Sequence, residues 1–347
     1  MSMVERFREQ AAACEALGSP MYAALLHRVG DDIEAGGVSA ELLAGHERDP
    51  GPSALALRLL GSVHRLVLDG RVPGLAAYYP SAGGVWDPEP GWTAFAAVLG
   101  SCAEEVRAWL DRPPQTNEVG RAAALVGGLL RIGEHHRLPV RLLEIGSSGG
   151  LNLCADRFWC SAPGGPAHGP PDSPVRLDGA WRGRPLRPWP DLRIVERLGS
   201  DVSPVDVTTA EGRLTLMSYV WPDQTARFDR LRGALRVSDG LRVEVRRQDA
   251  VSFVRGIEPV EGVTTVLWHS VMWQYLSAAD QAATSAAVDD LGASARETAP
   301  FAHLFLEPGR RTPGSDHEFL VVLCLWPGGE RRILGTSVGH GVPTTWE

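Results

Sequence analysis

The first 139 residues carry apolar positions at helical spacing and little of the alternation that marks strands. Phe7, Ala11 and Cys14 form one such stripe, and a second stripe follows over 22–29. Loops rich in Pro and Gly separate the helical stretches from one another. The pattern therefore predicts an all-helical N-terminal domain over residues 1–139. Further helices are expected in it at 53–69, 93–110 and 119–136.

From Val140 onward short apolar runs alternate with helical stretches, which is the pattern of a parallel sheet with crossover connections. A segment at about 155–192, rich in Pro, Gly and Arg, is expected to be an irregular insertion. The prediction is an α/β domain over 140–347. Strands are expected near 192–196, 213–220, 241–246, 263–269, 302–306 and 319–325, and helices at 223–236 and 277–296.

Composition narrows the classes of function. The chain is 44% hydrophobic and 22% charged, as soluble globular proteins are, and its 347 residues suggest two domains. A net charge of −8 argues against broad nucleic-acid binding, since no basic excess is present to neutralise phosphates. All 34 basic residues are arginine. The absence of lysine excludes a phosphate-loop lysine, a kinase strand lysine and a lysine Schiff base to pyridoxal phosphate.

The cysteines and the chain start point to a cytoplasmic protein. The five cysteines are scattered and form no C-x-x-C pair, which favours reduced thiols. No secretory signal and no apolar run of membrane-spanning length is evident, so no membrane contact is expected. The histidine and cysteine spacings match no zinc site, so no metal is expected either.

The stretch VRLLEIGSSGGLN, from Val140 to Asn152, is the strongest candidate for a binding site. It is expected to run from a buried strand through a glycine turn into a helix, an arrangement that presents backbone N–H groups to a ligand. Gly146 and Gly150 permit a tight turn and the close approach of a ligand. Glu144 interrupts the apolar run, where a charge is costly to bury without a partner.

Three later stretches place polar residues where neighbouring strands are expected to end, and ligands bind at such ends in open α/β sheets. Asp201 in GSDVSP could accept hydrogen bonds from both hydroxyls of a ribose, or it could simply begin a turn. Asp249, followed by Ala250 in RRQDA, could accept a bond from an adenine amino group. His269 in TTVLWHS is a candidate general base, although a histidine there is often only a satisfied polar group.

Two further stretches could reach such a site. In QTNEVGR, Asn117, Glu118 and Arg121 could bind a cofactor carboxylate or the substrate, because a guanidinium can hold both carboxylate oxygens. The same stretch could instead cap the helix that follows, with Glu118 in its first turn. In SYVWPDQ, Trp221 and Asp223 could line the acceptor site, or they could be a packing residue and a helix entry.

Aromatic residues suggest the kind of acceptor. Trp273 and Tyr275 follow His269 in the same stretch and are candidates either for the acceptor site or for core packing. The chain holds eleven tryptophans, which favour an apolar or aromatic small-molecule acceptor, although tryptophan is also ordinary core material.

In series, LLEIGSSGG, GSDVSP, QDA and VLWHSVMWQYL resemble the four motifs of class I S-adenosylmethionine-dependent methyltransferases, over about residues 140–326. The resemblance implies a Rossmann-like sheet, mostly parallel, with an antiparallel last strand. It implies that Asp201 binds the ribose and that Asp249, with Ala250, binds the adenine of S-adenosylmethionine. The stretch between the first two motifs is far longer than is usual in that family. The resemblance also implies that the methionine part is held by Glu144, Gly146, Ser147, Ser148 and Gly150. Asn152 and Arg121 are further candidates for binding the cofactor.

The whole chain also resembles an actinobacterial family known as domain of unknown function 2332. This resemblance rests on QTNEVGR, LLEIGSSGGLNL, SYVWPDQ and WHSVMWQYL. It implies no particular substrate.

The function expected from the sequence is methyl transfer from S-adenosylmethionine, in line, to an O or N atom of a small molecule. His269 would be the base, and the helical domain would cover the acceptor. Two alternatives stay open. The pattern G-x-S-x-G at 146–150 also fits the nucleophile elbow of α/β-hydrolases, with Ser148 as nucleophile, a later Asp and His340 as base. The helical start counts against this alternative, and it leaves Asp201 and Asp249 unexplained. The other alternative is a protein that binds S-adenosylmethionine without catalysis.

Overall fold

The computed structural model describes residues 2–49 and 54–347. The chain divides into two compact units, each built from two segments of sequence. The helical unit comprises Met1–Thr116 and Val205–Phe228, and the sheet unit comprises Asn117–Pro204 and Asp229–Glu347. This division differs from the expected boundary at residue 139, because the helix expected over 119–136 lies in the sheet unit and a later segment returns to the helical unit.

Short helices make up the first segment of the helical unit. They are α1 (Met3–Ala16), α2 (Pro20–Glu34), α3 (Val38–Leu42), α4 (Leu55–Leu68), α5 (Pro73–Ala76), α6 (Pro88–Ser101) and α7 (Ala103–Leu110), with a 3₁₀ turn, η2, at Pro80–Ala82. Capping residues set where they begin: Ser2 and Glu5 form a capping box before α1, and Ser19 caps α2, which has Pro20 at its first position. Local signals in the sequence therefore fix the first two helices.

The second segment of this unit corrects one prediction. A helix, α9 (Ala210–Ser218), forms where alternating apolar residues predicted a strand at 213–220. Thr209 caps it by accepting a hydrogen bond from the N–H of Gly212 at 3.0 Å. Helix α9 packs on α4, where Gly61 leaves room for the ring of Tyr219. The next helix, α10 (Thr225–Ser238), agrees with the helix expected at 223–236.

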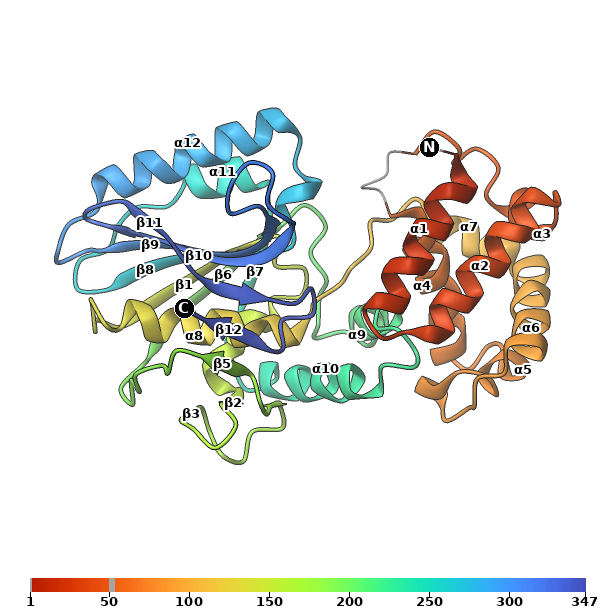
Figure 1. Ribbon diagram of the computed structural model, residues 1–347, viewed down its shortest axis with the longest axis horizontal. Helices are drawn as coiled ribbons and strands as arrows, with labels where there is room; N and C mark the ends of the chain where they lie inside the picture. Colours follow the sequence, from red (N-terminus) through yellow and green to blue (C-terminus); the bar gives the residue numbers. More distant parts are fainter. Residues whose placement is uncertain (1, 50–53) are drawn as a thin grey trace. The chain divides into compact units, whose positions relative to one another are not determined.

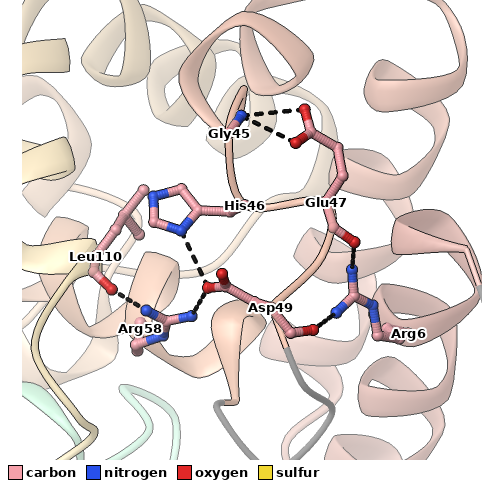
Figure 2. A network of polar contacts seen from close by, with 7 residues as sticks. All are labelled: Arg6, Gly45, His46, Glu47, Asp49, Arg58 and Leu110. Carbon is pink, nitrogen blue, oxygen red and sulfur yellow. Dashed lines mark hydrogen bonds and ion pairs between the residues drawn. The ribbon is translucent and has the colours of Figure 1, made fainter.

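A polar network holds residues 45–49, which follow α3 (Figure 2). The carboxylate of Asp49 accepts a hydrogen bond from Arg58 and pairs with Nδ1 of His46 at 3.0 Å. Arg58 also donates to the carbonyl of Leu110, and Arg6 donates to two carbonyls of the segment. Burial acts to raise the pKa of Asp49, but the bonds from Arg58 and His46 outweigh it, and the pKa lies below its usual range. The ionised carboxylate thus ties residues 45–49 to α4, and the bonds of Arg6 tie them to α1.

Nine strands of the sheet unit form one sheet within the described residues. They are β1 (Val140–Ile145), β5 (Trp181–Gly183), β6 (Ile194–Asp201), β7 (Glu244–Arg247), β8 (Thr264–Ser270), β9 (Phe301–Gly309), β10 (Glu318–Trp326), β11 (Glu330–Ser337) and β12 (Thr344–Trp346). Their order across the sheet is β5-β12-β11-β10-β9-β8-β1-β6-β7. The mostly parallel sheet predicted from the sequence is confirmed, because the run from β9 to β7 is parallel throughout.

The strand order reverses at β1. From β1 the chain passes to β6 and β7 on one side and then returns to β8 and β9 on the other. Such a reversal is a topological switch point, and ligands bind outside the carboxyl ends of the strands there. Antiparallel pairing extends beyond the last strand of the parallel run, since β9 to β12 are successive antiparallel neighbours joined by short connections.

Helices cover both faces of this sheet (Figure 1). Helix α8 (Ala122–Ile132) lies close to one face, because a Cβ on Gly127 or Gly128 would collide with Trp346 or Leu304. Helices α11 (Ala250–Arg255) and α12 (Ala278–Ser294) cover the other face, where Phe301 joins their apolar core. Among the described residues, no helix has both the length and the apolar character that a membrane crossing requires.

The predicted insertion at 155–192 is more ordered than expected. Its strands β2 (Trp159–Ser161), β3 (Ala167–His168) and β4 (Arg176–Leu177) form a separate small sheet. Strand β5, at the end of the insertion, joins the main sheet beside β12. Periodicity does not reveal this pairing, because its two strands are more than 160 residues apart.

Candidate functional site

The turn after β1 carries the predicted binding motif. Gly146 (φ 67°), Ser148 (φ 52°) and Gly150 (φ 71°) all lie in the left-handed region, which residues other than glycine seldom adopt. The turn leads into a 3₁₀ segment, η4 (Leu151–Arg157), and not into the α-helix that the sequence predicted. The turn therefore does not form the anion-binding site that the start of an α-helix would provide.

Protein side chains fill the space beside both glycines. A Cβ atom at Gly146 would lie 2.9 Å from Cβ and Cγ of Met272, and one at Gly150 would lie 2.7 Å from Cγ2 of Val245. These distances are well below van der Waals contact. Glycine is thus required at both positions by backbone conformation and packing, and the close approach of a ligand is not needed to explain it.

Asp201 ends β6 directly beside β1 and fixes the turn. Its Oδ2 accepts a hydrogen bond from the N–H of Ser148 at 2.9 Å, and its Oδ1 accepts one from the N–H of Ser203 at 2.8 Å. Ser147 also anchors the turn, because its N–H and its hydroxyl both donate to the carbonyl of Ser200. Each carboxylate oxygen of Asp201 has a second lone pair, which suits it to accept a further donor.

Glu144 is a buried carboxyl at the centre of this edge and is only 3% exposed. Burial raises its pKa well above the usual range and the charge of Asp201 raises it further, whereas Trp268, Arg121 and Asn152 act in the opposite direction. The indole N–H of Trp268 and the amide of Asn152 lie within hydrogen-bonding reach of this carboxyl, but among the described residues Oε2 of Glu144, Oδ1 of Asn152 and the indole N–H complete no hydrogen bond of normal geometry. The buried carboxyl and its polar neighbours are therefore incompletely hydrogen-bonded, which is costly unless a ligand or water supplies further partners.

Part of QTNEVGR packs against the turn. Oδ1 of Asn117 accepts a hydrogen bond from the N–H of Leu151 at 3.0 Å, and the carbonyl of Glu118 accepts one from Nδ2 of Asn152 at 3.3 Å. The carboxylate of Glu118 also accepts a bond from the N–H of Gly120 at 3.0 Å. This stretch therefore orients Asn152 beside Glu144 and caps the short turn η3 (Val119–Arg121) that precedes α8.

Arg121 links three parts of the site. Its Nε donates to the carbonyl of Gly339 at 3.1 Å, and its Nη1 donates to the carbonyl of Ser270, at the end of β8, at 3.3 Å. Its positive charge opposes the rise in the pKa of Glu144 that burial causes. The guanidinium therefore lies within electrostatic range of the buried carboxyl.

His269 lies near the end of β8 among buried rings. Its Nδ1 pairs with Oε1 of Glu307 at 2.8 Å, and its Nε2 pairs with Nε2 of His303 at 3.0 Å. The ring stacks on Trp273 and on Phe305, with centroid distances of 5.2 and 5.1 Å. Protein groups thus engage both ring nitrogens, so a role for His269 as a general base requires one of them to exchange its partner.

The residues after His269 form a tight segment. Val271 has φ 51°, which is unusual for a β-branched residue, and η5 (Trp273–Tyr275) follows. The indole of Trp273 covers His269, whereas Tyr275 is 52% exposed. Of these two predicted acceptor residues, only Trp273 stacks on the buried cluster within the described part of the chain.

Asp249 caps α11. Its Oδ1 accepts a hydrogen bond from the N–H of Ser252 at 2.8 Å, and hydrogen bonding with Ser252 lowers its pKa. Ala250 is the first residue of α11 and is buried. The capping contact explains Asp249 structurally, and its role toward an adenine stays a prediction.

Trp221 and Asp223 belong to the helical unit and not to the edge of the sheet. Asp223 accepts hydrogen bonds from the hydroxyl of Ser19 at 2.6 Å and from the N–H of Met21 at 3.0 Å, at the start of α2. Trp221 lies in the apolar core of this unit, near the ring of Tyr22. These contacts are those of packing and helix entry.

Sequence reasoning missed Glu307 and His303, which complete the cluster around His269. A signal was present, because Glu307 interrupts the apolar run FAHLFLEPG just as Glu144 interrupts LLEI. Among the described residues, no three His, Cys, Asp or Glu side chains are arranged to hold a metal ion. A buried carboxyl at β1 and a buried ring cluster at β8 and β9 therefore both lie toward the carboxyl ends of the parallel strands.

Comparison with known proteins gives one match. The family described as uncharacterized protein conserved in bacteria (DUF2332) matches residues 4–346. No curated protein and no solved structure matches the chain. The predicted resemblance to this family is thus confirmed over nearly the whole length, and the methyltransferase resemblance stays a prediction. The chain belongs to the DUF2332 family of bacterial proteins.

Proposed function

We propose that this protein is an S-adenosylmethionine-dependent methyltransferase that methylates an O or N atom of a small molecule. The observation that carries the proposal is the group of unsatisfied polar atoms around Glu144, at the carboxyl end of β1 and beside the point where the strand order reverses. The parallel order β7-β6-β1-β8-β9, followed by antiparallel β10, supports a Rossmann-like sheet of the methyltransferase kind.

The chemistry of these atoms fits the methionine part of the cofactor. An ammonium group offers three N–H donors, which Oε2 of Glu144 and Oδ1 of Asn152 lack. A carboxylate offers acceptors to the guanidinium of Arg121. Glu144 and Asn152 would therefore hold the ammonium, and Arg121 would hold the carboxylate.

Neighbouring strand ends would hold the nucleoside. Asp201, at the end of β6, would accept the ribose hydroxyls, and Asp249 with Ala250, after β7, would contact the adenine. When bound, S-adenosylmethionine supplies a methyl group attached to a positively charged sulfur. His269 stays the predicted base for an acceptor that must lose a proton, and a covering role for the helical unit stays a prediction.

Transfer of a labelled methyl group tests this proposal. The protein is incubated with methyl-labelled S-adenosylmethionine and the small-molecule fraction of a bacterial extract, and labelled products are separated. We expect label in a small molecule, and we expect its loss in Asp201→Ala. Binding of the cofactor without any labelled product would favour the non-catalytic alternative.

One observation favours a second candidate function. Ser148, the central residue of G-x-S-x-G, has φ 52°, the strained conformation typical of a nucleophile elbow. Two features count against it, because β1 is the first strand of the sheet in the chain and the turn leads into a 3₁₀ segment. Hydrolysis of p-nitrophenyl acetate that disappears in Ser148→Ala would support the hydrolase, and equal rates in both proteins would remove it.

A further inference from the structure

Glu307, His269 and His303 form a buried chain of titratable side chains at the carboxyl ends of β8 and β9. They are 7%, 2% and 8% exposed, respectively. On β9, His303 and Glu307 are an even number of residues from Phe301, so they lie on the face of the sheet that α11 and α12 cover. Solvent therefore has little access to the protons that these groups exchange.

One oxygen of Glu307 makes three contacts. Its Oε1 pairs with Nδ1 of His269 at 2.8 Å and accepts hydrogen bonds from the N–H of Met272 at 3.0 Å and of Trp273 at 3.3 Å. These two backbone groups follow Val271, whose left-handed φ stores strain that neighbouring contacts must hold. Glu307 thus fixes both the ring of His269 and the strained segment after it.

The contact between the two imidazole rings requires one proton. Their Nε2 atoms are 3.0 Å apart, a hydrogen-bond distance, and such a bond needs one N–H and one lone pair. Because Oε1 of Glu307 already accepts two backbone N–H bonds, it acts as an acceptor and Nδ1 of His269 carries the hydrogen. A neutral His269 then has its lone pair on Nε2, and His303 donates to it.

The surroundings of His303 agree with a neutral donor ring. Burial lowers its pKa well below the usual range, and the positive charge of Arg331 lowers it further. Cys324 of β10 lies opposite His303 in the sheet. The groups around His303 therefore disfavour a second proton on its ring.

We propose that Glu307 is a positioning residue that holds His269 in the Nδ1–H tautomer, and that His303 donates one shared proton to Nε2 of His269. This hydrogen bond from His303 must then break before Nε2 of His269 can accept a proton as a base. The use of His269 in methyl transfer rests on the proposed function, whereas this arrangement of protons does not depend on any cofactor.

Long-range ¹⁵N–¹H spectra of the histidine rings at pH 7 test this arrangement. We expect separate signals for His269, with Nδ1 protonated and Nε2 unprotonated. Glu307→Gln keeps an acceptor oxygen and should preserve this pattern, whereas Glu307→Leu should average or invert the two signals. His303→Phe should shift the Nε2 signal of His269 and leave Nδ1 protonated.

His64 is the internal control, because it lies in the helical unit and is held by the carbonyl of Ser218 and the hydroxyl of Ser81. Its unchanged signals show that the helical unit of a variant is folded. Averaged His269 signals in the wild type, or an unmoved Nε2 signal in His303→Phe, would overturn the proposal. These two measurements, on the wild type and on His303→Phe, still test the proposal if Glu307→Leu does not fold. Calorimetry with S-adenosylmethionine separately tests the proposed function, so the two failures are distinguishable.

Discussion

At the scale of the single residue, burial controls the charge of Glu144. Its carboxyl cannot be hydrated, and its pKa is raised well above the usual range, chiefly by desolvation. Without a cation beside it, the group therefore stays protonated to a higher pH than an exposed glutamate does. An ammonium ligand would favour the ionised form, so ligand binding and loss of this proton are linked.

Replacing Glu144 by Gln should change how stability depends on pH. The folded protein holds this proton more tightly than the unfolded chain, so its contribution to wild-type stability falls as pH rises from 4.5 toward the raised folded pKa. The fall amounts to about 1.4 kcal/mol for each pH unit in that range. Urea titrations over the same pH range should show that the free energy of unfolding of Glu144→Gln rises steadily relative to that of the wild type. A difference that does not vary with pH would contradict a raised pKa.

His64 gives a prediction of the opposite sign. Burial lowers its pKa to about 3, although the hydrogen bond with the Ser218 carbonyl opposes the shift. The unfolded chain takes up the proton near pH 6.5, so stability is complete above that pH and falls by about 1.4 kcal/mol per pH unit toward pH 3. His64→Gln should remove this slope from urea unfolding measured between pH 7 and 4. Equal slopes of stability against pH in the wild type and in His64→Gln would contradict a lowered pKa for His64.

Sequence reasoning succeeds for residues whose role depends on near neighbours. The buried position of Glu144 follows from the run LLEI alone. Sequence reasoning does not identify Glu307, because its partner His269 is 38 residues away and the two side chains meet only when β8 pairs with β9. For the same reason the sequence indicates His269 as a polar strand end but not that both of its ring nitrogens are engaged.

At the scale of the element, the turn after β1 depends on glycine for two separable reasons. Gly146 has a left-handed φ and contacts Met272, whereas Gly164 has a similar φ of 61° and open space within 4 Å of the place where a Cβ would lie. Gly164→Ala should cost about 1 kcal/mol for the backbone alone, and Gly146→Ala should cost at least about 1 kcal/mol more. Urea unfolding measures both, and Gly146→Ala with Met272→Ala should recover part of the difference. Equal costs would show that packing against Met272 is unimportant.

The start of α2 depends on a residue far away in the sequence. Asp223 accepts two hydrogen bonds there, from the hydroxyl of Ser19 and the N–H of Met21. Asp223→Ala should lower the free energy of unfolding by about 1–3 kcal/mol, since it leaves buried donors unsatisfied. Asp31→Ala, on the exposed face of the same helix, removes a surface ion pair with Arg8 and should cost less than about 1 kcal/mol. Equal losses in the two variants would mean that Asp223 is not a cap.

Elements are predictable where periodicity and local signals agree. The apolar runs at β1, β8, β9 and β10 and the stripes of α1 and α2 identify those elements correctly. The prediction for the segment at α9 is wrong, because its alternating leucines match the pattern of a strand, whereas Thr209 caps a helix. Strands β5 and β12 are too short and too distant in sequence for any local pattern to reveal their pairing.

At the scale of the whole molecule, two interleaved segments make each unit, so the order of motifs along the chain does not match their order in space. The predicted acceptor residues Trp221 and Asp223 lie in a stretch that returns to the helical unit, although they stand between two strands of the sheet in sequence. The strand order of the sheet, by contrast, brings together motifs that are far apart in the sequence. It brings the carboxyl ends of β1, β6, β7 and β8 to one edge, as the series of motifs predicted.

Calorimetric titration with S-adenosylmethionine tests the central claim, a cofactor site built on Glu144. We predict saturable binding to the wild type, with an affinity that rises with pH toward the raised pKa of Glu144 as its proton is released. Glu144→Gln should weaken binding by about tenfold or more, because a charge-assisted hydrogen bond is lost. Asp290→Asn, at an exposed position on α12, should bind as the wild type does. Absence of heat at millimolar cofactor, or equal affinity in Glu144→Gln and the wild type, would contradict the claim.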